Sequence, residues 1–456
     1  VVVRNVGDAS APLALRTLDG ARLPDVALAP GASLFLGPRA PPDAEAHAPM
    51  DVRVRNGTMR LAVSERVESS LVVPKLRPGE STIGRYGRTD VPARAFHVEG
   101  ELLAYATPGP TPLPALVDRA QREALVAAHT FTSADVAAAL LRALDRGVAV
   151  RVLLEGAPPG GVPAEERALV ATLQARGAQV LTMGGEGARY RTMHAKLVVV
   201  DRALVSVSTE NLNEGGSRGF GVLVEDAALA GAVAAVMDAD AAPWHDVHPA
   251  AFGEAPAFVA PSLRAPPEPA RFAGPRDVTL VLSPDDPRAL ADAVASARAS
   301  VDVAMLRADA QGPMVAALVD AARAGARVRL LLDGRHDDGA NRETVARLAA
   351  LAAREGLALE AKLDAPSRTL HAKTFVVDGA TSYVGSMNWV RAAWSDNREA
   401  GLLVEDAGLA AWLTQAFEED WSEKGEAPPR AAVPWPAWGA LAAAALSGPS
   451  WRRGRA

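Results

Sequence analysis

Residues 371–378 read HAKTFVVD and are followed by GSMN at residues 385–388. An earlier stretch has the same form, because residues 194–201 read HAKLVVVD and residues 208–211 read STEN. The histidine and the asparagine are 17 positions apart in both copies. A repeated set of His, Lys and Asn at one spacing predicts that the chain brings two similar units together around these side chains.

The first two residues of each set are two positions apart on an expected strand. Alternate side chains of a strand share one face, so His371 and Lys373 point the same way, as do His194 and Lys196. The four residues after each lysine are apolar or nearly so, which is typical of a buried strand. Each copy therefore presents an imidazole and an ammonium group on one surface.

The second part of each copy adds neutral hydrogen-bonding groups. Ser386 and Asn388 lie two positions apart after a turn, and Thr209 and Asn211 match them in the first copy. Two cations flanked by neutral donors suit a phosphate group. One imidazole can attack phosphorus while the other protonates the leaving oxygen. We expect neither a metal nor another cofactor, because the lysines supply the positive charge.

These motifs resemble those of the phospholipase D superfamily, whose signature is a doubled H-x-K-x4-D with G-S-x-N behind it. The resemblance spans residues 96–424 and implies two similar α/β halves that face each other, a covalent phosphohistidine intermediate and no metal. It implies catalytic positions at His194, Lys196, Asp201, His371, Lys373 and Asp378, and supporting positions at Thr209, Asn211, Ser386, Asn388 and Glu399. Because the two aspartates end their strands, we expect them to hold the local turn or the lysine.

The first copy departs from the signature. Ser208 and Thr209 replace Gly-Ser, and aligning the two LVED stretches sets Gly219 against Glu399. The first half thus lacks the carboxylate of the second.

The roles of the two histidines depend on that carboxylate. By resemblance His194 is the nucleophile and His371 the acid, with Glu399 as the expected partner of His371. Glu210 or Glu214 is close enough in sequence to serve His194. With such a substitute, His194 keeps its role, which we favour; without it, the roles are exchanged.

Composition bounds the possibilities. A chain of 456 residues with 49% hydrophobic residues is long enough for two or three domains with full cores. The net charge of −6 gives no overall basic footprint for nucleic acid. The absence of cysteine excludes disulfides, cysteine-type zinc sites and thiol catalysis.

Residues 1–92 predict a small all-β sandwich. Short alternating runs such as 1–3, 33–36 and 60–63 are separated by turn signals. The run N-x-G-D at residues 5–8 and the Pro-Gly turn at residues 30–31 resemble a lamin-tail-like domain, with an adhesive or spacer role. The chain begins at Val1 without a methionine, which is compatible with a leader before it.

From about residue 96 the sequence predicts an α/β fold: two duplicated halves, each with a mixed sheet covered by helices, at residues 93–255 and 276–425. In the first half we expect a strand at 124–131, a helix at 134–146 capped by Ser133 and ended by Gly147, and a strand at 148–154. The second half repeats this order at 300–306, 313–324 and 326–332, with an offset of 178 at the glycine and 177 at the histidine. A Pro-rich linker at 256–275 joins the halves.

Other residues give weaker signals. His129 and His336 have no counterpart in the opposite copy and are interpreted as structural. Trp389 and Trp394 fit either a pocket or the core. Within the tail, residues 426–456, the uncharged run at 431–446 fits either a C-terminal membrane anchor or a frayed Ala-rich end.

The sequence therefore predicts a phospholipase D-like phosphodiesterase or phosphatidyltransferase that acts on phospholipids at a membrane surface, on the extracytoplasmic side if the tail is an anchor and in solution otherwise. Because both motifs lie in one chain, a monomer is expected. Two alternatives remain: a nuclease of the same superfamily, with nucleic acid as the partner, and a binding protein with weak catalysis.

Overall fold

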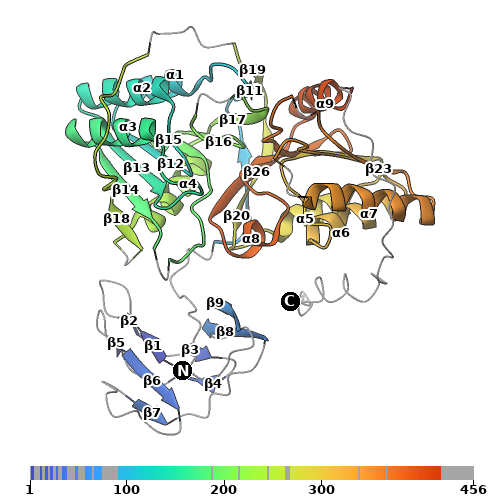
Figure 1. Ribbon diagram of the computed structural model, residues 1–456, viewed down its shortest axis with the longest axis horizontal. Helices are drawn as coiled ribbons and strands as arrows, with labels where there is room; N and C mark the ends of the chain where they lie inside the picture. Colours follow the sequence, from blue (N-terminus) through green and yellow to red (C-terminus); the bar gives the residue numbers. More distant parts are fainter. Residues whose placement is uncertain are drawn as a thin grey trace.

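The chain carries two α/β halves that lie side by side (Figure 1). This computed structural model describes residues 91–422 without 186–187, 214–215, 244–245, 262–267, 337–338 and 366, together with short segments between residues 2 and 73. Each half has one mixed sheet with helices on its outer face. The predicted α/β class and duplication are confirmed.

The first sheet has nine strands, with parallel pairing from β12 to β14 and antiparallel pairing elsewhere. In spatial order they are β18 (Val247–Pro249), β14 (Gln179–Met183), β13 (Ala149–Glu155), β12 (Glu123–Ala128), β15 (Leu197–Val200), β16 (Leu204–Ser208), β17 (Gly219–Glu225), β11 (Leu102–Thr107) and β19 (Ala270–Phe272).

The second sheet repeats the central order of the first. Its eight strands are β10 (Arg94–Val98), β20 (Arg276–Ser283), β26 (Glu399–Glu405), β25 (Thr381–Gly385), β24 (Lys373–Val377), β21 (Ser300–Met305), β22 (Arg327–Leu332) and β23 (Leu359–Leu363). Two edge strands cross the predicted domain boundaries, because β10 joins the second sheet and β19 joins the first. The boundaries themselves stay predictions.

The helices cover the sheets in two groups. Those of the first half are α1 (Leu113–Asp118), α2 (Ala134–Asp145), α3 (Ala164–Ala175) and α4 (Ala227–Ala241), and those of the second are α5 (Arg288–Ala295), α6 (Pro313–Arg323), α7 (Ala340–Glu355), α8 (Arg391–Ser395) and α9 (Ala407–Ser422). Helices α1–α3 and α5–α7 lie on the outer sides of the two sheets (Figure 1). Strand β12 shows why: Val126 packs into the outer core, whereas Leu125 packs toward the other half.

The local signals of the sequence are reproduced in the first half. Helix α2 begins after Ser133, whose side chain accepts a hydrogen bond of 3.3 Å from the amide of Val136. Gly147 follows the helix with a φ of +83°, and Gly325 follows α6 with a φ of +101°. The predicted strands and helices agree with the observed ones to within three residues at their ends.

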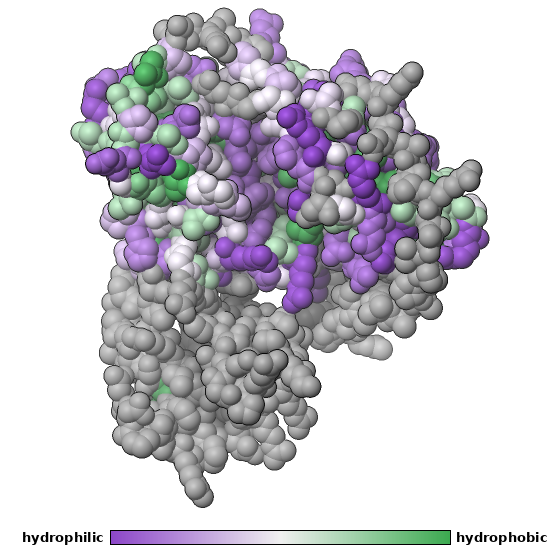
Figure 2. Space-filling model, viewed as in Figure 1, coloured by the Kyte–Doolittle hydropathy of each residue, from purple (hydrophilic) through white to green (hydrophobic). Residues whose placement is uncertain are grey.

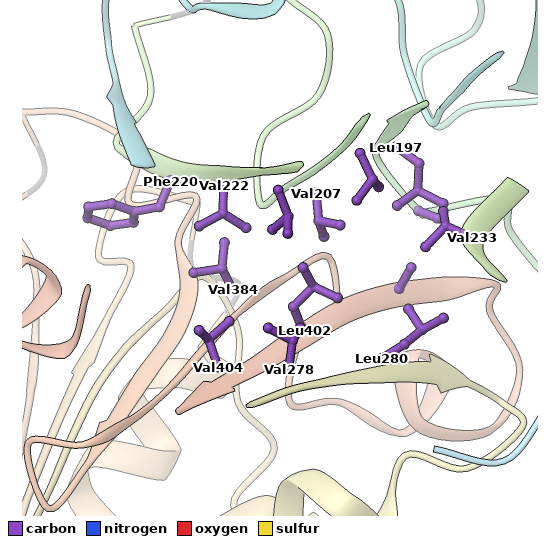
Figure 3. Packing of buried hydrophobic residues seen from close by; sticks show 14 of the residues in the cluster. Leu197, Val207, Phe220, Val222, Val233, Val278, Leu280, Val384, Leu402 and Val404 are labelled. Carbon is purple, nitrogen blue, oxygen red and sulfur yellow. The ribbon is translucent and has the colours of Figure 1, made fainter. Parts of the chain in front are cut away.

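The inner faces of the two sheets form one apolar core. Strands β16 and β17 contact β24, β25 and β26 across the junction. Figure 3 shows Val207 and Val222 of the first half facing Val384 and Leu402 of the second. The halves are therefore parts of one packed body, which fixes the distance between their motifs.

Two arginines, Arg398 fully buried and Arg218 mostly buried, tie each sheet to a helix of the opposite half. Arg398, before β26, lies 2.8 Å from a carboxylate oxygen of Asp240 on α4. Arg218, before β17, donates a hydrogen bond of 3.0 Å to Asp420 on α9. The two pairs occupy equivalent positions in the two halves.

The described segments of the N-terminal region form strands in sheets ordered β1-β6-β7, β2-β5 and β4-β3-β8-β9. Their bounds are β1 (Val2–Arg4), β2 (Ala11–Pro12), β3 (Arg16–Leu18), β4 (Ala21–Arg22), β5 (Ala27–Leu28), β6 (Ser33–Gly37), β7 (His47–Pro49), β8 (Gly57–Val63) and β9 (Arg66–Val73). The lamin-tail-like assignment stays a prediction.

The predicted tail at 426–456 lies outside the described residues. Among the residues that are described, no helix combines the length and the apolar character that crossing a membrane requires.

The cross-half ion pair gives a stability prediction. Replacing Asp240 with Asn leaves the guanidinium of Arg398 buried with one carboxylate fewer, and we expect the free energy of unfolding to fall by about 3 kcal/mol or more. Asp238→Asn is the matched control on the same helix: Asp238 pairs with Arg151 and Arg202 at the surface, and its loss should cost less than about 1 kcal/mol. Urea unfolding of both variants tests this. Equal losses would contradict it.

Candidate active site

Two short backbone contacts bring the motifs of opposite halves together. Residue Met193 forms a parallel bridge with Arg398, and Leu370 forms the equivalent bridge with Arg218. In the first bridge the amide of His194 donates a hydrogen bond of 2.9 Å to the carbonyl of Arg398. Each histidine therefore sits beside the strand start of the other half.

Two acidic residues at strand ends accept hydrogen bonds from the backbone of these segments. Glu155 accepts a hydrogen bond of 2.7 Å from the amide of Met193, and Asp333 accepts one of 2.7 Å from the amide of Leu370. The sequence shows these residues as the ends of equivalent strands, but nothing local indicates what they bind. They support the backbone beside each histidine.

His194 is paired with the carboxylate of the second half. Its Nδ1 lies 2.8 Å from Oε2 of Glu399, which is fully buried, and the amide of Asn397 donates a hydrogen bond of 3.0 Å to the other carboxylate oxygen. Burial raises the pKa of Glu399, but His194, Lys196 and Ser386 outweigh burial and hold it below the ordinary value. A carboxylate only accepts, so Nδ1 of His194 carries the proton and Nε2 has a lone pair.

His371 has a different environment. Its Nδ1 lies 3.3 Å from Oε1 of Glu210 and 3.1 Å from Nζ of Lys373. Burial, followed by the charge of Lys373, lowers the pKa of His371 to about 4. The ammonium donates to an unprotonated Nδ1, whereas the carboxylate favours a protonated one, so both tautomers of His371 have a partner.

This pairing corrects the sequence-based assignment. Glu399 was expected to serve His371 and Glu210 to serve His194, and each carboxylate instead faces the histidine of the other half. The backbone bridges explain the exchange, because they set the strand start of one half against the histidine of the other. Glu214 lies outside the described residues.

The two lysine side chains contact backbone carbonyls next to the histidines. Lys373 donates a hydrogen bond of 2.8 Å to the carbonyl of His371 and lies 3.4 Å from the carbonyl of Thr209, while Lys196 donates to the carbonyl of His194. Both are almost fully buried. Burial lowers the pKa of Lys196 to about 8; burial and then the charge of Lys196 lower the pKa of Lys373 well below its ordinary value. An anion is therefore strongly favoured between them.

The hydroxyl and amide positions divide into two kinds. Thr209 accepts a hydrogen bond of 2.9 Å from the amide of Phe220, and Ser386 accepts one of 3.0 Å from the amide of Ala400. Both hydroxyls thus join neighbouring strands. The amide oxygens of Asn211 and Asn388 are buried and make no hydrogen bond within the described part of the chain. An amide oxygen is an acceptor, so a ligand group that meets either of them must donate a hydrogen bond.

The structure does not bring Asp201 and Asp378 into the site. They end β15 and β24, roughly 16 Å along the strand from the lysines. The carboxylate of Asp201 accepts hydrogen bonds from the amides of residues 121–123, and that of Asp378 from residues 298–300. Both aspartates have positive φ values, 52° and 51°, at the hairpin turn. Their observed contacts are with turns.

His129 is a residue that sequence reasoning left out of the site. Its ring meets that of His194 edge-on with 5.1 Å between centroids, and its Nδ1 lies 3.3 Å from the carbonyl of Met193. Burial, then Lys196 and His194, lower its pKa to about 3. Its place after β12, at the edge where the motifs meet, is the signal that locates it. His129 is a neutral imidazole at the site.

The remaining sequence candidates lie outside the site. His336 is largely exposed and contacts the hydroxyl of Thr369 at 3.0 Å. Trp389 is buried in the core of the second half, and Trp394 packs against the same core. The structure thus favours the core interpretation for both tryptophans.

Fold and site together define a class of enzyme. Two α/β halves set two imidazoles, each against a carboxylate, above two buried lysines, and hydrophilic residues gather where the halves meet on the face shown in Figure 2. This arrangement serves displacement at a phosphorus atom.

Residues 113–240 and 290–421 match the family described as "Cardiolipin synthase, PLD-like domain". The chain belongs to this phospholipase D-like family and is an enzyme of the phosphodiester hydrolase and phosphatidyltransferase class.

Solved structures provide further similarity. The fold is similar to that of a phosphatidylserine synthase from Haemophilus influenzae Rd KW20, with a TM-score of 0.53, 12% sequence identity, and coverage of 69% of this chain and 84% of that chain. Nuc from Salmonella typhimurium, a phospholipase D family member, matches with a TM-score of 0.29, 24% identity, and coverage of 33% and 95%. Among curated proteins, none matches the chain.

The lowered lysine pKa values predict proton uptake on anion binding. At pH 8 Lys196, with a pKa of about 8, is half protonated, and a bound anion raises the pKa of both lysines. Sulfate does not titrate near neutral pH, so its binding should take up protons from the buffer. Calorimetry in two buffers of different ionisation enthalpy measures the uptake. Binding heats that are the same in both buffers would refute the effect, and Lys196→Met/Lys373→Met is the control without it.

Proposed function

We propose that this enzyme cleaves phosphodiesters of phospholipids, with water or an alcohol as acceptor and without a divalent metal, through a phosphohistidine at His194. The observation that supports the proposal most strongly is the 2.8 Å contact between Nδ1 of His194 and the buried carboxylate of Glu399. It directs the lone pair of Nε2 outward, and Glu399 stabilises the imidazolium that forms on attack. Burial lowers the pKa of His194, which keeps the ring neutral before attack.

In the first step Nε2 of His194 forms a bond to phosphorus. The bond from phosphorus to the leaving oxygen breaks, and the oxygen keeps the electron pair. His371 donates a proton from Nε2 to that oxygen. His371 acts as an imidazolium in this step, with its Nδ1–H facing the carboxylate of Glu210. The negative charge of the diester offsets the two lysines and raises the pKa of His371 from its value of about 4.

In the second step the roles reverse. His371 removes a proton from water or from an alcohol, and the oxygen of that molecule attacks phosphorus. The bond from phosphorus to Nε2 of His194 breaks, and its electron pair returns to the ring. Water yields hydrolysis, and an alcohol yields transfer. Lys196 and Lys373 stabilise the phosphoryl oxygens in both steps, which is the electrostatic work that a metal performs in other enzymes.

Two observations favour a lipid substrate. The matching family is described as "Cardiolipin synthase, PLD-like domain", and cardiolipin is a phospholipid. The chain has a net charge of −6, which disfavours a polyanion as substrate. A membrane surface is then the natural place of action.

A paired substrate assay tests the proposed function. We expect release of head group or transfer product from phosphatidylglycerol vesicles in the presence of EDTA, and no cleavage of single- or double-stranded DNA. Cleavage of DNA alone would make the protein a nuclease. Activity that EDTA abolishes and Mg²⁺ restores would remove the metal-independent mechanism, and turnover of neither substrate would favour a binding protein.

Trapping tests the role of His194. Trypsin releases residues 192–196 as TMHAK and residues 369–373 as TLHAK, so the two histidine peptides differ by a single Met-to-Leu exchange and separate by mass. After quenching with a slowly cleaved diester at alkaline pH, we expect the phosphoryl group on TMHAK. Label on TLHAK would exchange the two roles, and active enzyme without label on either peptide would rule out the covalent route. His194→Asn is the unlabelled control.

A further inference from the structure

The strand position that supplies a carboxylate in the second half is occupied by glycine in the first. Glu399 is the first residue of β26, and Gly219 is the first residue of β17. The register of the sheets makes them equivalent, because Ser208 pairs with Gly221 as Gly385 pairs with Gly401. The cross-half bridges set Gly219 beside the segment of His371, just as they set Glu399 beside His194.

The side chain of Glu210 fills the space above Gly219. A Cβ atom at residue 219 would lie 2.4 Å from Cγ of Glu210, 2.6 Å from its Oε1 and 2.8 Å from Oγ1 of Thr209. Real Cβ atoms do not approach so closely, so any larger residue at 219 excludes the observed position of Glu210. The counterpart of Glu210 in the second half is Met387, which is buried in the apolar core.

Each carboxylate oxygen of Glu210 faces a polar side chain. Oε1 lies 3.3 Å from Nδ1 of His371, and Oε2 accepts a hydrogen bond of 3.1 Å from the hydroxyl of Ser217. Burial raises the pKa of Glu210, but His371 and Lys373 outweigh burial, and the pKa lies below its ordinary value. The group is therefore an ionised carboxylate at neutral pH.

We propose that Glu210 is the positioning residue of His371, that it performs from the loop after β16 the task that Glu399 performs for His194 from a strand, and that Gly219 is required because it leaves the space. The proposal rests on the function proposed above. The carboxylate comes from the position of Met387 in one half and from the position of Gly219 in the other, so the two histidines keep equivalent partners from positions that are not equivalent in the duplication.

Because the two carboxylates come from different positions, the two histidine–carboxylate pairs are held differently. Glu399 sits at the start of a central strand, and both of its oxygens are held, by His194 and Asn397. Glu210 sits on a loop, and it shares Nδ1 of His371 with Lys373. A fixed partner suits a nucleophile that keeps one tautomer. A shared Nδ1 suits an acid that loses and regains its proton within each cycle.

Moving the carboxylate back to the strand tests the proposal. Glu210→Met copies Met387, and Glu210→Met/Gly219→Glu rebuilds in the first half the arrangement of the second. We expect kcat on the diester to fall by about 100-fold in the single variant, the lower end of what general acid–base catalysis supplies, and to recover at least tenfold in the double variant. Gly219→Glu alone should be destabilised, because two side chains compete for one space. A double variant that folds but is no more active than Glu210→Met would overturn the proposal.

A spectroscopic readout separates this proposal from the function. The ¹⁵N shifts of the imidazole of His371, assigned with His371→Asn, report which nitrogen carries the proton. The charged groups that face this ring are Lys373 at the start of the following strand β24, and Glu210 and Lys196 from the first half. We expect the wild-type protein to populate the Nδ1–H form, Glu210→Met to shift to the Nε2–H form that Lys373 favours, and the double variant to shift back.

The tautomer can be observed whether or not any diester is cleaved. An inactive protein that shows these shifts would therefore refute the proposed function and still support the positioning role of Glu210. An unchanged tautomer in Glu210→Met overturns the positioning role. If Glu210→Met does not fold, Glu210→Gln, which preserves the shape and removes the charge, carries the same measurement.

Discussion

The site depends on two backbone bridges between the halves, one between Met193 and Arg398 and the other between Leu370 and Arg218. Each bridge joins the segment just before a histidine to the segment just before an inner strand of the other half. The arginines at these bridges are anchored in turn by Asp240 and Asp420 on the helices of the opposite half. Because buried ion pairs lose most when one partner is removed, the bridge geometry and the packing of the halves depend on each other.

The centre of this arrangement is electrostatically unfavourable without a ligand. Two lysines are buried close together, and their main hydrogen-bond acceptors are backbone carbonyls. Burial of a cation is costly unless an anion offsets it, and Glu210 and Glu399 offset the charge while they also face the histidines. A phosphodiester adds the remaining negative charge. The proximity of the two buried lysines is thus both the source of this cost and the reason that anion binding is favourable, and the apolar junction around them keeps the lysines from separating.

Duplication explains most of the site, and one departure from it explains the rest. Equivalent positions hold the histidines, the lysines, Thr209 with Ser386, and the strand-end acids Glu155 with Asp333. The carboxylates break the pattern, since Glu399 comes from a strand and Glu210 from a loop. The proposed mechanism needs one nucleophile and one acid, and the two histidines are held in different ways that suit these two roles.

The sequence alone determined which histidines and lysines form the candidate site, the duplication, the α/β class and the ends of helix α2, because these follow from local spacing, strand alternation and capping, which are properties of neighbouring residues. It did not determine which carboxylate faces which histidine, that Asp201 and Asp378 bind turns away from the lysines, or that His129 joins the site. Those facts depend on how two halves far apart in the chain pack together. Alignment placed Gly219 against Glu399 and thereby revealed a missing carboxylate, but only the three-dimensional contact between Gly219 and Glu210 accounts for its replacement. Spacing along a chain specifies which groups are presented, and packing between halves decides what each group meets.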